Sequence, residues 1–166
     1  MEGEPVSGAD APHGAPPFPL SRETHIRLDR DGVFWSQGER LAHPGLQRAF
    51  SRWIDVDPDT GRYILKNDIN WAYLTVDDAP YQVRGIDANG ALTLSDETVE
   101  PLDARTLRID DDDVPYCDVK GGRMPARFAK AAAFALLDRA RVDGDDVYYG
   151  DAKIRRVARG EGAKRR

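Results

Sequence analysis

The fold is predicted mainly from residues 26–35, IRLDRDGVFW, and from the way this stretch recurs later in the chain. Residues 26–28 alternate apolar and charged side chains as a β-strand does, and residues 33–35 resume as a second strand. Between them, the sequence from Asp29 to Gly32 has the composition of a tight turn. The stretch therefore predicts a β-hairpin, with order beginning near His25.

The same pattern returns in the last third of the chain. Leu107 to Asp110 repeats Ile26 to Asp29 in character, and Val114 and Tyr116 correspond to Val33 and Trp35. After each hairpin come a glycine bend, a proline, a helical pattern, an acidic turn and a strand. Because the order of elements is repeated as well as one tetrapeptide, we predict a duplicated strand–helix–strand unit.

One helix is predicted in each unit. Pro44 suits the first helical position, where its missing N–H costs nothing. Apolar side chains follow at helical spacing, which places one stripe toward a core: Leu46, Phe50 and Trp53. In the second unit, Pro125 is the expected counterpart of Pro44. The apolar face predicted for that helix consists of Phe128, Ala132, Ala135 and Leu136.

The middle of the chain is predicted as β-structure. Residues 71–76 and 81–86 are candidate strands, and Asn89–Gly90 is a strong two-residue hairpin signal leading into residues 91–94. The predicted fold class is therefore α+β, with two related strand–helix–strand units joined by a central β segment. The expected divisions are a disordered Pro/Gly-rich leader (1–22), the first unit (23–70), the central segment (71–104), the second unit (105–157) and a disordered basic tail (158–166).

Composition narrows the class of protein. The chain has 166 residues, of which 40% are hydrophobic and 32% charged, as in ordinary globular proteins. It has no apolar run of membrane-spanning length and no secretory signal, so we expect a cytoplasmic protein. Cys117 is the only cysteine, which excludes a disulfide within the chain. The net charge of −5 disfavours nucleic acid as a partner, although the basic tail leaves a nucleic-acid accessory role as a minor alternative.

Three stretches carry a resemblance to a bacterial protein family. They are residues 28–35 (LDRDGVFW), residues 61–65 (GRYIL), and Trp71 together with residues 76–81 (VDDAPY). They resemble the family of the domain of unknown function 1285. That resemblance implies a small two-part α+β protein with repeated motifs and a suggested signalling or ligand-sensing role. It implies no catalytic residues, and the Pro-rich leader and the basic tail depart from the family's usual pattern.

The sequence lacks the standard signatures of catalytic, phosphate-binding and metal-binding sites, so no cofactor and no catalytic residue is predicted. The run from Asp110 to Asp113 leaves two interpretations open. It is the second hairpin turn with extra charge, or it is a divalent-cation site. On the second interpretation the protein is a small metal-dependent enzyme that uses Asp110, Asp112 and Asp113 with Asp29 or Asp31. Cys117 is expected to be a small buried apolar residue.

A ligand site is predicted around the central segment, where aromatic faces and polar groups accompany one another. Its candidate residues are Asn67, Trp71, Asp78, Tyr81, Arg84 and Arg108. The alternative is that the aromatic side chains belong to the core and that residues 77–80 form a turn. We therefore expect a non-catalytic binding or sensory module that takes a small molecule or a protein partner. The oligomeric state stays open.

Overall fold

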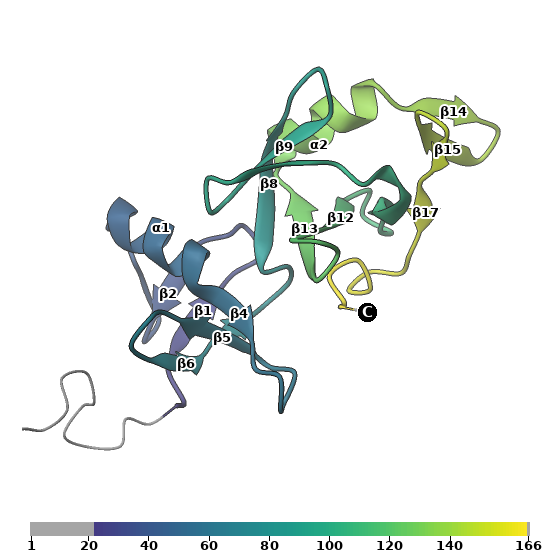
Figure 1. Cartoon of the computed structure of the whole chain (residues 1–166). Helices are drawn as coiled ribbons and strands as arrows, with labels where there is room; N and C mark the ends of the chain where they lie inside the picture. The colour runs from purple at the N-terminus through teal and green to yellow at the C-terminus, as the bar shows by residue number, and fades with distance from the viewer. Residues whose placement is uncertain (1–21, 166) are drawn as a thin grey trace, which may run out of the picture.

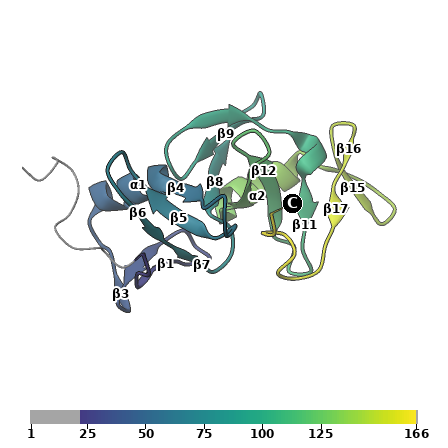
Figure 2. The same cartoon turned by 60° about the horizontal axis from the view of Figure 1, so that its bottom comes forward.

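A computed structural model describes residues 22–165 of the chain as two halves arranged side by side (Figures 1 and 2). The first half contains β1 (Ile26–Leu28), β2 (Phe34–Ser36), β3 (Glu39–Arg40), α1 (Pro44–Trp53), β4 (Ile54–Val56), β5 (Tyr63–Lys66), β6 (Trp71–Tyr73) and β7 (Thr75–Val76). The second half contains β8 (Tyr81–Ile86), β9 (Ala91–Leu94), β10 (Val99–Pro101), the 3-10 helix η1 (Ala104–Thr106), β11 (Arg108–Ile109), β12 (Pro115–Val119), β13 (Met124–Phe128), α2 (Lys130–Asp138), β14 (Arg141–Asp143), β15 (Asp146–Tyr149), β16 (Ala152–Lys153) and β17 (Arg155–Arg156). The predicted α+β class is confirmed. No helix in this described part is long and apolar enough to cross a membrane.

Strand pairing follows a similar course in the two halves. In the first, β1 pairs antiparallel with β2 and parallel with β7, within a sheet of order β3-β2-β1-β7. In the second, β11 pairs antiparallel with β12 and parallel with β17, within the seven-stranded sheet β10-β9-β8-β13-β12-β11-β17. Each half also has a three-stranded sheet, β4-β5-β6 or β14-β15-β16. The division into duplicated units stays a prediction.

Both hairpin turns are held by an aspartate at the same place. Asp29 Oδ1 accepts hydrogen bonds from the backbone N–H groups of Asp31 (2.9 Å) and Val33 (3.0 Å). Asp110 Oδ1 accepts the same pair of bonds from Asp112 (2.9 Å) and Val114 (3.0 Å). Aspartate side chains stabilise turns in this way because they satisfy backbone donors that the turn leaves free. The acidic run therefore forms a turn.

The first helix forms as predicted. It begins at Pro44, and the His43 side chain accepts a hydrogen bond from the Leu46 N–H at 3.3 Å. Phe50 packs edge-on against Phe34 with ring centroids 5.4 Å apart, and Trp53 lies beside Phe50. Since Phe34 is fully buried and both Phe50 and Trp53 pack against the core, these two residues of the stripe face it as predicted.

The predicted start of the second helix is wrong. Pro125 and Phe128 lie in β13, and α2 begins only at Lys130. β13 pairs with β12 on one side and, from Ala126 to Phe128, with β8 on the other. Pro125 has no backbone N–H to donate, but it comes before the residues of β13 that pair with β8. No hydrogen bond between β13 and β8 is therefore lost. Pairing on both sides of this segment outweighed the local helical pattern, while Ala132 and Leu136 are buried as predicted.

The central segment is divided between the two halves. The strand expected over residues 71–76 is two strands, β6 and β7, interrupted at the buried residue Leu74. β6 pairs with β5 and β7 with β1, so both belong to the first half. The strands expected over residues 81–86 and 91–94 are β8 and β9, and they form a hairpin with Asn89–Gly90 in its turn. The turn is longer than the two residues predicted, because β8 ends at Ile86 and β9 begins at Ala91. A single apolar cluster then extends from Leu28 and Phe34 into the second half.

The end of the chain, where a disordered tail was expected, packs mainly onto the second half, and Arg165 also contacts Gly61 and Tyr63 of the first half. Gly162 is buried against the ring of Tyr116, and its carbonyl accepts a hydrogen bond from Arg108 Nε at 2.8 Å. Arg159 lies 2.5 Å from Asp112, and Arg156 lies 3.4 Å from Asp113. Basic residues of the last segment thus pair with the acidic turn. The predicted leader, apart from Arg22, lies outside the described residues.

Candidate functional site

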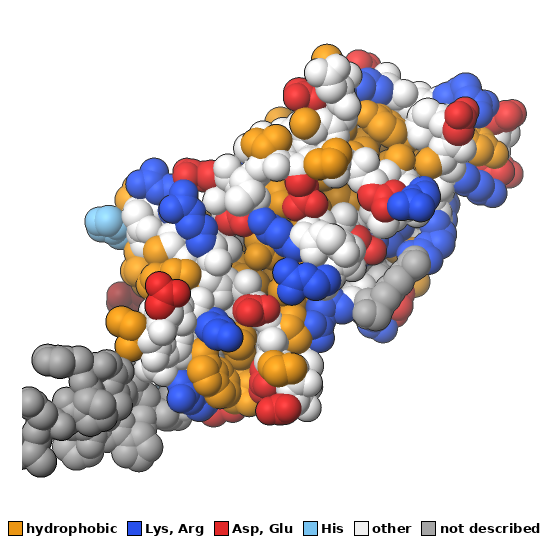
Figure 3. All heavy atoms as spheres, in the orientation of Figure 1, with side chains coloured by type: hydrophobic (Ala, Val, Ile, Leu, Met, Phe, Trp, Pro, Cys, Tyr) orange, Lys and Arg blue, Asp and Glu red, His pale blue; other side chains and the backbone are white. Residues whose placement is uncertain are grey.

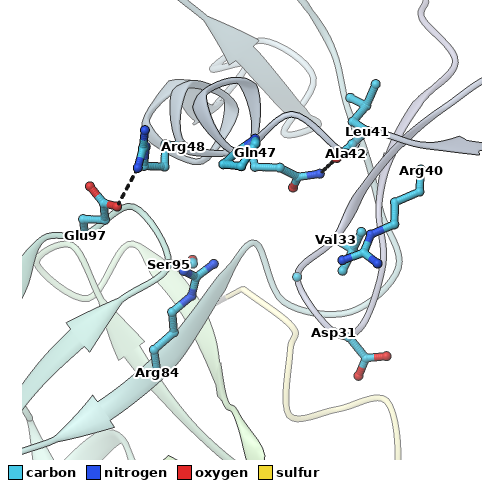
Figure 4. Close-up of a pocket in the computed structure, with 12 residues that line it drawn as sticks. Asp31, Val33, Arg40, Leu41, Ala42, Gln47, Arg48, Arg84, Ser95 and Glu97 are labelled. Atoms are coloured by element: carbon cyan, nitrogen blue, oxygen red, sulfur yellow. Dashed lines mark hydrogen bonds and ion pairs between the residues drawn. The ribbon is translucent and has the colours of Figure 1, made fainter.

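A cavity of about 550 Å³ lies where the two halves meet. The first half contributes the β1–β2 turn, the β3–α1 loop and the start of α1, while the second half contributes β8 and the β9–β10 turn. The lining residues are Asp31, Gly32, Val33, Arg40, Leu41, Ala42, Pro44, Gln47, Arg48, Arg84, Ser95 and Glu97. Figure 4 shows Arg84 and Arg40 extending toward this space from opposite sides. A volume of this size is in the range of small-molecule sites.

The wall on the first half is held by Gln47. Its side-chain carbonyl accepts a hydrogen bond from the Phe34 N–H at 3.2 Å, and its amide donates to the carbonyl of Leu41. These contacts tie the first turn of α1 to β2 and to the loop after β3 (Figure 4). The backbone next to Arg40 and Arg48 is therefore held by hydrogen bonds.

The base of the cavity is where the β1–β2 turn meets β8. Gly32 has φ +81°, and a Cβ there would lie 2.6 Å from Gln82 Cγ, so only glycine allows this approach. Gln82 Nε2 donates a hydrogen bond to the carbonyl of Arg30 at 3.1 Å. The two halves are thus in direct contact beneath the cavity.

The charges that line the cavity are unevenly paired. Arg52 of α1 and Glu97 lie 3.1 Å apart, which joins the two halves at the rim, whereas Arg48 is 4.0 Å from the same carboxylate. Arg40 and Arg84 have no ion-pair or hydrogen-bond partner for their guanidinium groups among residues 22–165. On the face seen in Figure 3, basic and acidic side chains otherwise alternate over both halves.

A second cavity of about 410 Å³ occupies the related place in the second half. It lies between the β11–β12 turn and the start of α2, and its lining includes Asp113, Arg127, Lys130 and, from the first half, Asp31. Its arginine is already engaged, because Arg127 lies 3.0 Å from Asp78. The first cavity therefore offers more unpaired basic groups.

Two of the six predicted site residues, Asn67 and Trp71, lie in the first half. Asn67 Oδ1 accepts hydrogen bonds from the N–H groups of Ile69 (2.9 Å) and Asn70 (2.8 Å), within the β5–β6 turn. Trp71 carries the guanidinium of Arg22 over its ring at 4.4 Å.

Three of the others, Asp78, Tyr81 and Arg108, are buried or nearly so. Asp78 accepts a hydrogen bond from the Tyr116 hydroxyl at 2.8 Å, besides its ion pair with Arg127. Tyr81 is buried at the start of β8. Arg108 lies 2.9 Å from Asp118, and its side chain is only 2% exposed.

The predicted site residues are therefore spread over the molecule, and Arg84 alone of the six lines the larger cavity. A ligand-binding role for the other five stays a prediction. Arg40, Arg48 and Ser95 were not predicted, since each lies in a segment with no distinctive local pattern. Their one shared property is that the fold brings them to one cavity.

Of the candidate metal-ligating and nucleophilic groups, Asp112 and Asp113 are paired and Cys117 is buried. The side chains of Asp112 and Asp113 face arginines, and within residues 22–165 no group of three or more His, Cys, Asp or Glu side chains could hold a metal ion. Cys117 is fully buried, as predicted, and its burial raises the pKa of the thiol to about 12. Little thiolate therefore forms at neutral pH.

Comparison with known proteins identifies the fold. No protein-family model matches the sequence, and no curated protein matches it. Among solved structures, a DUF1285 family protein from Silicibacter pomeroyi DSS-3 is similar, with a TM-score of 0.63 and 18% identity over 89% of this chain and 90% of that one. A DUF1285 family protein from Shewanella baltica OS155 has a TM-score of 0.54 and 17% identity, covering 71% of this chain and 94% of its own. The chain therefore has the fold of DUF1285 family proteins, as its sequence motifs predicted.

Proposed function

We propose that the protein is a non-catalytic ligand-binding module whose ligand occupies the cavity between the two halves. One observation carries this proposal: Arg40 of the first half and Arg84 of the second line the same cavity, and neither guanidinium has a partner among the described residues. Unpaired cations that line a concave site are common anchors for small molecules. The ion pairs of Asp112 and Asp113 and the burial of Cys117 support a binding role over a catalytic one.

A sensory role follows from the position of the site. A ligand that contacts both halves favours whichever arrangement of the halves it fits best, so binding shifts the population of arrangements. The ion pair between Arg52 and Glu97 crosses the same junction and would respond to such a shift. A protein partner could then recognise one arrangement.

The test is a thermal-shift screen of anionic and neutral metabolites with the wild type and two variants. Ala42 lines the cavity from an exposed loop, so Ala42→Trp fills the site without entering the core. Ala88 is exposed in the β8–β9 turn and lines neither cavity, so Ala88→Trp is the matched control. A ligand at about 100 times its Kd adds roughly 2.7 kcal/mol of stability.

The proposal predicts a stabilising ligand whose effect Ala42→Trp removes and Ala88→Trp retains. A ligand that stabilises both variants equally would show that its site lies elsewhere and would contradict the proposal. Failure of the whole panel to stabilise the wild type would also count against it, and would favour a macromolecular partner.

A further inference from the structure

The cavity is locally basic in a protein that is acidic overall. It is lined by the three arginines Arg40, Arg48 and Arg84 against two carboxylates, whereas the whole chain has a net charge of −5. A basic concavity in an acidic surface attracts small anions while the remaining surface repels large polyanions. The charge distribution therefore favours a small anionic ligand.

The two free guanidinium groups approach the cavity from different elements. Arg40 ends β3, and Arg84 lies in β8; both are exposed. In Figure 4 their side chains extend toward the space from opposite sides, and the Asp31 carboxylate points away from it. Guanidinium groups form paired N–H hydrogen bonds to carboxylate and phosphate oxygens. Two such groups on opposite walls suit a ligand with an acidic group at each end.

A buried hydroxyl adds a third donor. Ser95 is 5% exposed and lines the cavity, and its Oγ accepts a hydrogen bond from the Gln82 N–H at 3.0 Å. Its hydroxyl hydrogen donates to no acceptor within residues 22–165. A buried hydroxyl gains a hydrogen bond when an oxyanion is placed within its reach. Ser95 therefore supplies a neutral donor on the same wall as Arg84.

The remaining acidic group at the rim is already neutralised. Glu97 faces Arg52 at 3.1 Å and Arg48 at 4.0 Å, so its charge is directed toward α1. The backbone of Glu97 also has φ +68°, in the left-handed region that residues other than glycine rarely adopt. The carboxylate thus lies between the halves, at the edge of the cavity, where it pairs with α1.

We infer that the ligand is a small molecule with two acidic groups, one bound by Arg40 and the other by Arg84 with the Ser95 hydroxyl. This inference rests on the proposed function and specifies the class of its ligand. The acidic groups are carboxylates or phosphates, since both present oxygens to a guanidinium in the same way. A single acidic group would engage one wall only and leave the other arginine unpaired.

Isothermal titration calorimetry of the full chain tests the inference. The probes are succinate, glutarate and pimelate as dicarboxylates of increasing length, 3-phosphoglycerate as a phosphorylated acid, and butyrate and inorganic phosphate as ligands with one acidic group. We expect at least one two-ended acid to bind about 10-fold or more tightly than butyrate and phosphate, because it gains a second charge-assisted contact. The dicarboxylates and 3-phosphoglycerate together distinguish the two kinds of acidic group.

Three variants locate the contacts. Arg40→Gln and Arg84→Gln should each weaken the best two-ended acid about 10-fold or more, with little effect on the melting temperature because both side chains are exposed and unpaired. Arg30→Gln is the matched control, since Arg30 is an exposed arginine of the neighbouring turn that lines neither cavity. It should leave the affinity unchanged.

The outcomes separate the ligand class from the proposed function. If two-ended acids bind no more tightly than one-ended ones, or if their binding survives Arg40→Gln and Arg84→Gln, the inference is wrong. The proposed function would still stand if a neutral ligand stabilised the wild type and lost its effect in Ala42→Trp. If no ligand of either kind depends on the cavity, both fail.

Discussion

Replacing Gly162 by alanine tests whether the end of the chain packs as the structure shows. A Cβ at this position would lie 2.4 Å from Cδ2, 2.5 Å from Cε2 and 2.9 Å from Cγ of the Tyr116 ring. The ring is held on its other side, because Tyr116 is 2% exposed and its hydroxyl donates to Asp78 Oδ2 at 2.8 Å. Either the ring or the last segment must therefore move.

The expected cost follows from the size of this overlap. Forcing an extra methyl group into a packed region costs about 1–3 kcal/mol. Displacing Gly162 also lengthens the 2.8 Å hydrogen bond from Arg108 Nε to its carbonyl, which places the cost toward the upper part of that range. For a chain of this length, each kcal/mol lowers the melting temperature by about 2–4 °C.

The assay is differential scanning calorimetry of the wild type, Gly162→Ala and Gly85→Ala. Gly85 is the matched control, since a Cβ there meets no atom within 4 Å and its φ lies outside the left-handed region. We expect Gly85→Ala to stay within about 1 kcal/mol of the wild type. A melting temperature for Gly162→Ala equal to that of Gly85→Ala would refute the packed arrangement of the last segment.

Three further predictions follow from buried or paired groups. Asp118→Asn should destabilise the protein by about 3–5 kcal/mol in urea unfolding, because it leaves the Arg108 charge buried without its partner. Burial disfavours the ionised form of Asp96, but hydrogen bonds from Lys120 and Thr98 outweigh it and lower the pKa of this carboxyl. The unfolded state then binds more protons, so stability should decline as the pH falls below about 4, and Asp96→Asn should flatten that decline. Cys117, whose pKa burial raises to about 12, should react with a thiol reagent at pH 7.5 only after denaturation.

Each of these three has a clear contrary result. Unchanged urea stability in Asp118→Asn would show that Arg108 is solvated. If the free energy of unfolding falls equally steeply below about pH 4 in the wild type and in Asp96→Asn, other carboxyl groups govern acid unfolding. Labelling of the native thiol at the rate of the denatured protein would show that Cys117 is accessible.

The sequence alone determined the elements whose signals are local. The Asn89–Gly90 hairpin, the helix that begins at Pro44 and the two turns held by Asp29 and Asp110 all depend on residues within a few positions of one another. Turn geometry, helix starts and the apolar stripe of a helix are consequences of backbone hydrogen bonding and side-chain period, which neighbouring residues set.

Tertiary structure decided the site and the less local elements. Pro125 resembles a helix start, yet it lies in β13 because β12 and β8 pair with that segment from elsewhere in the chain. Only the fold brings Arg40 and Arg84 to one cavity, since each comes from a different half and has an unremarkable local sequence. A binding site depends on which distant side chains converge, and the packing of the two halves sets that convergence through contacts that no local pattern specifies.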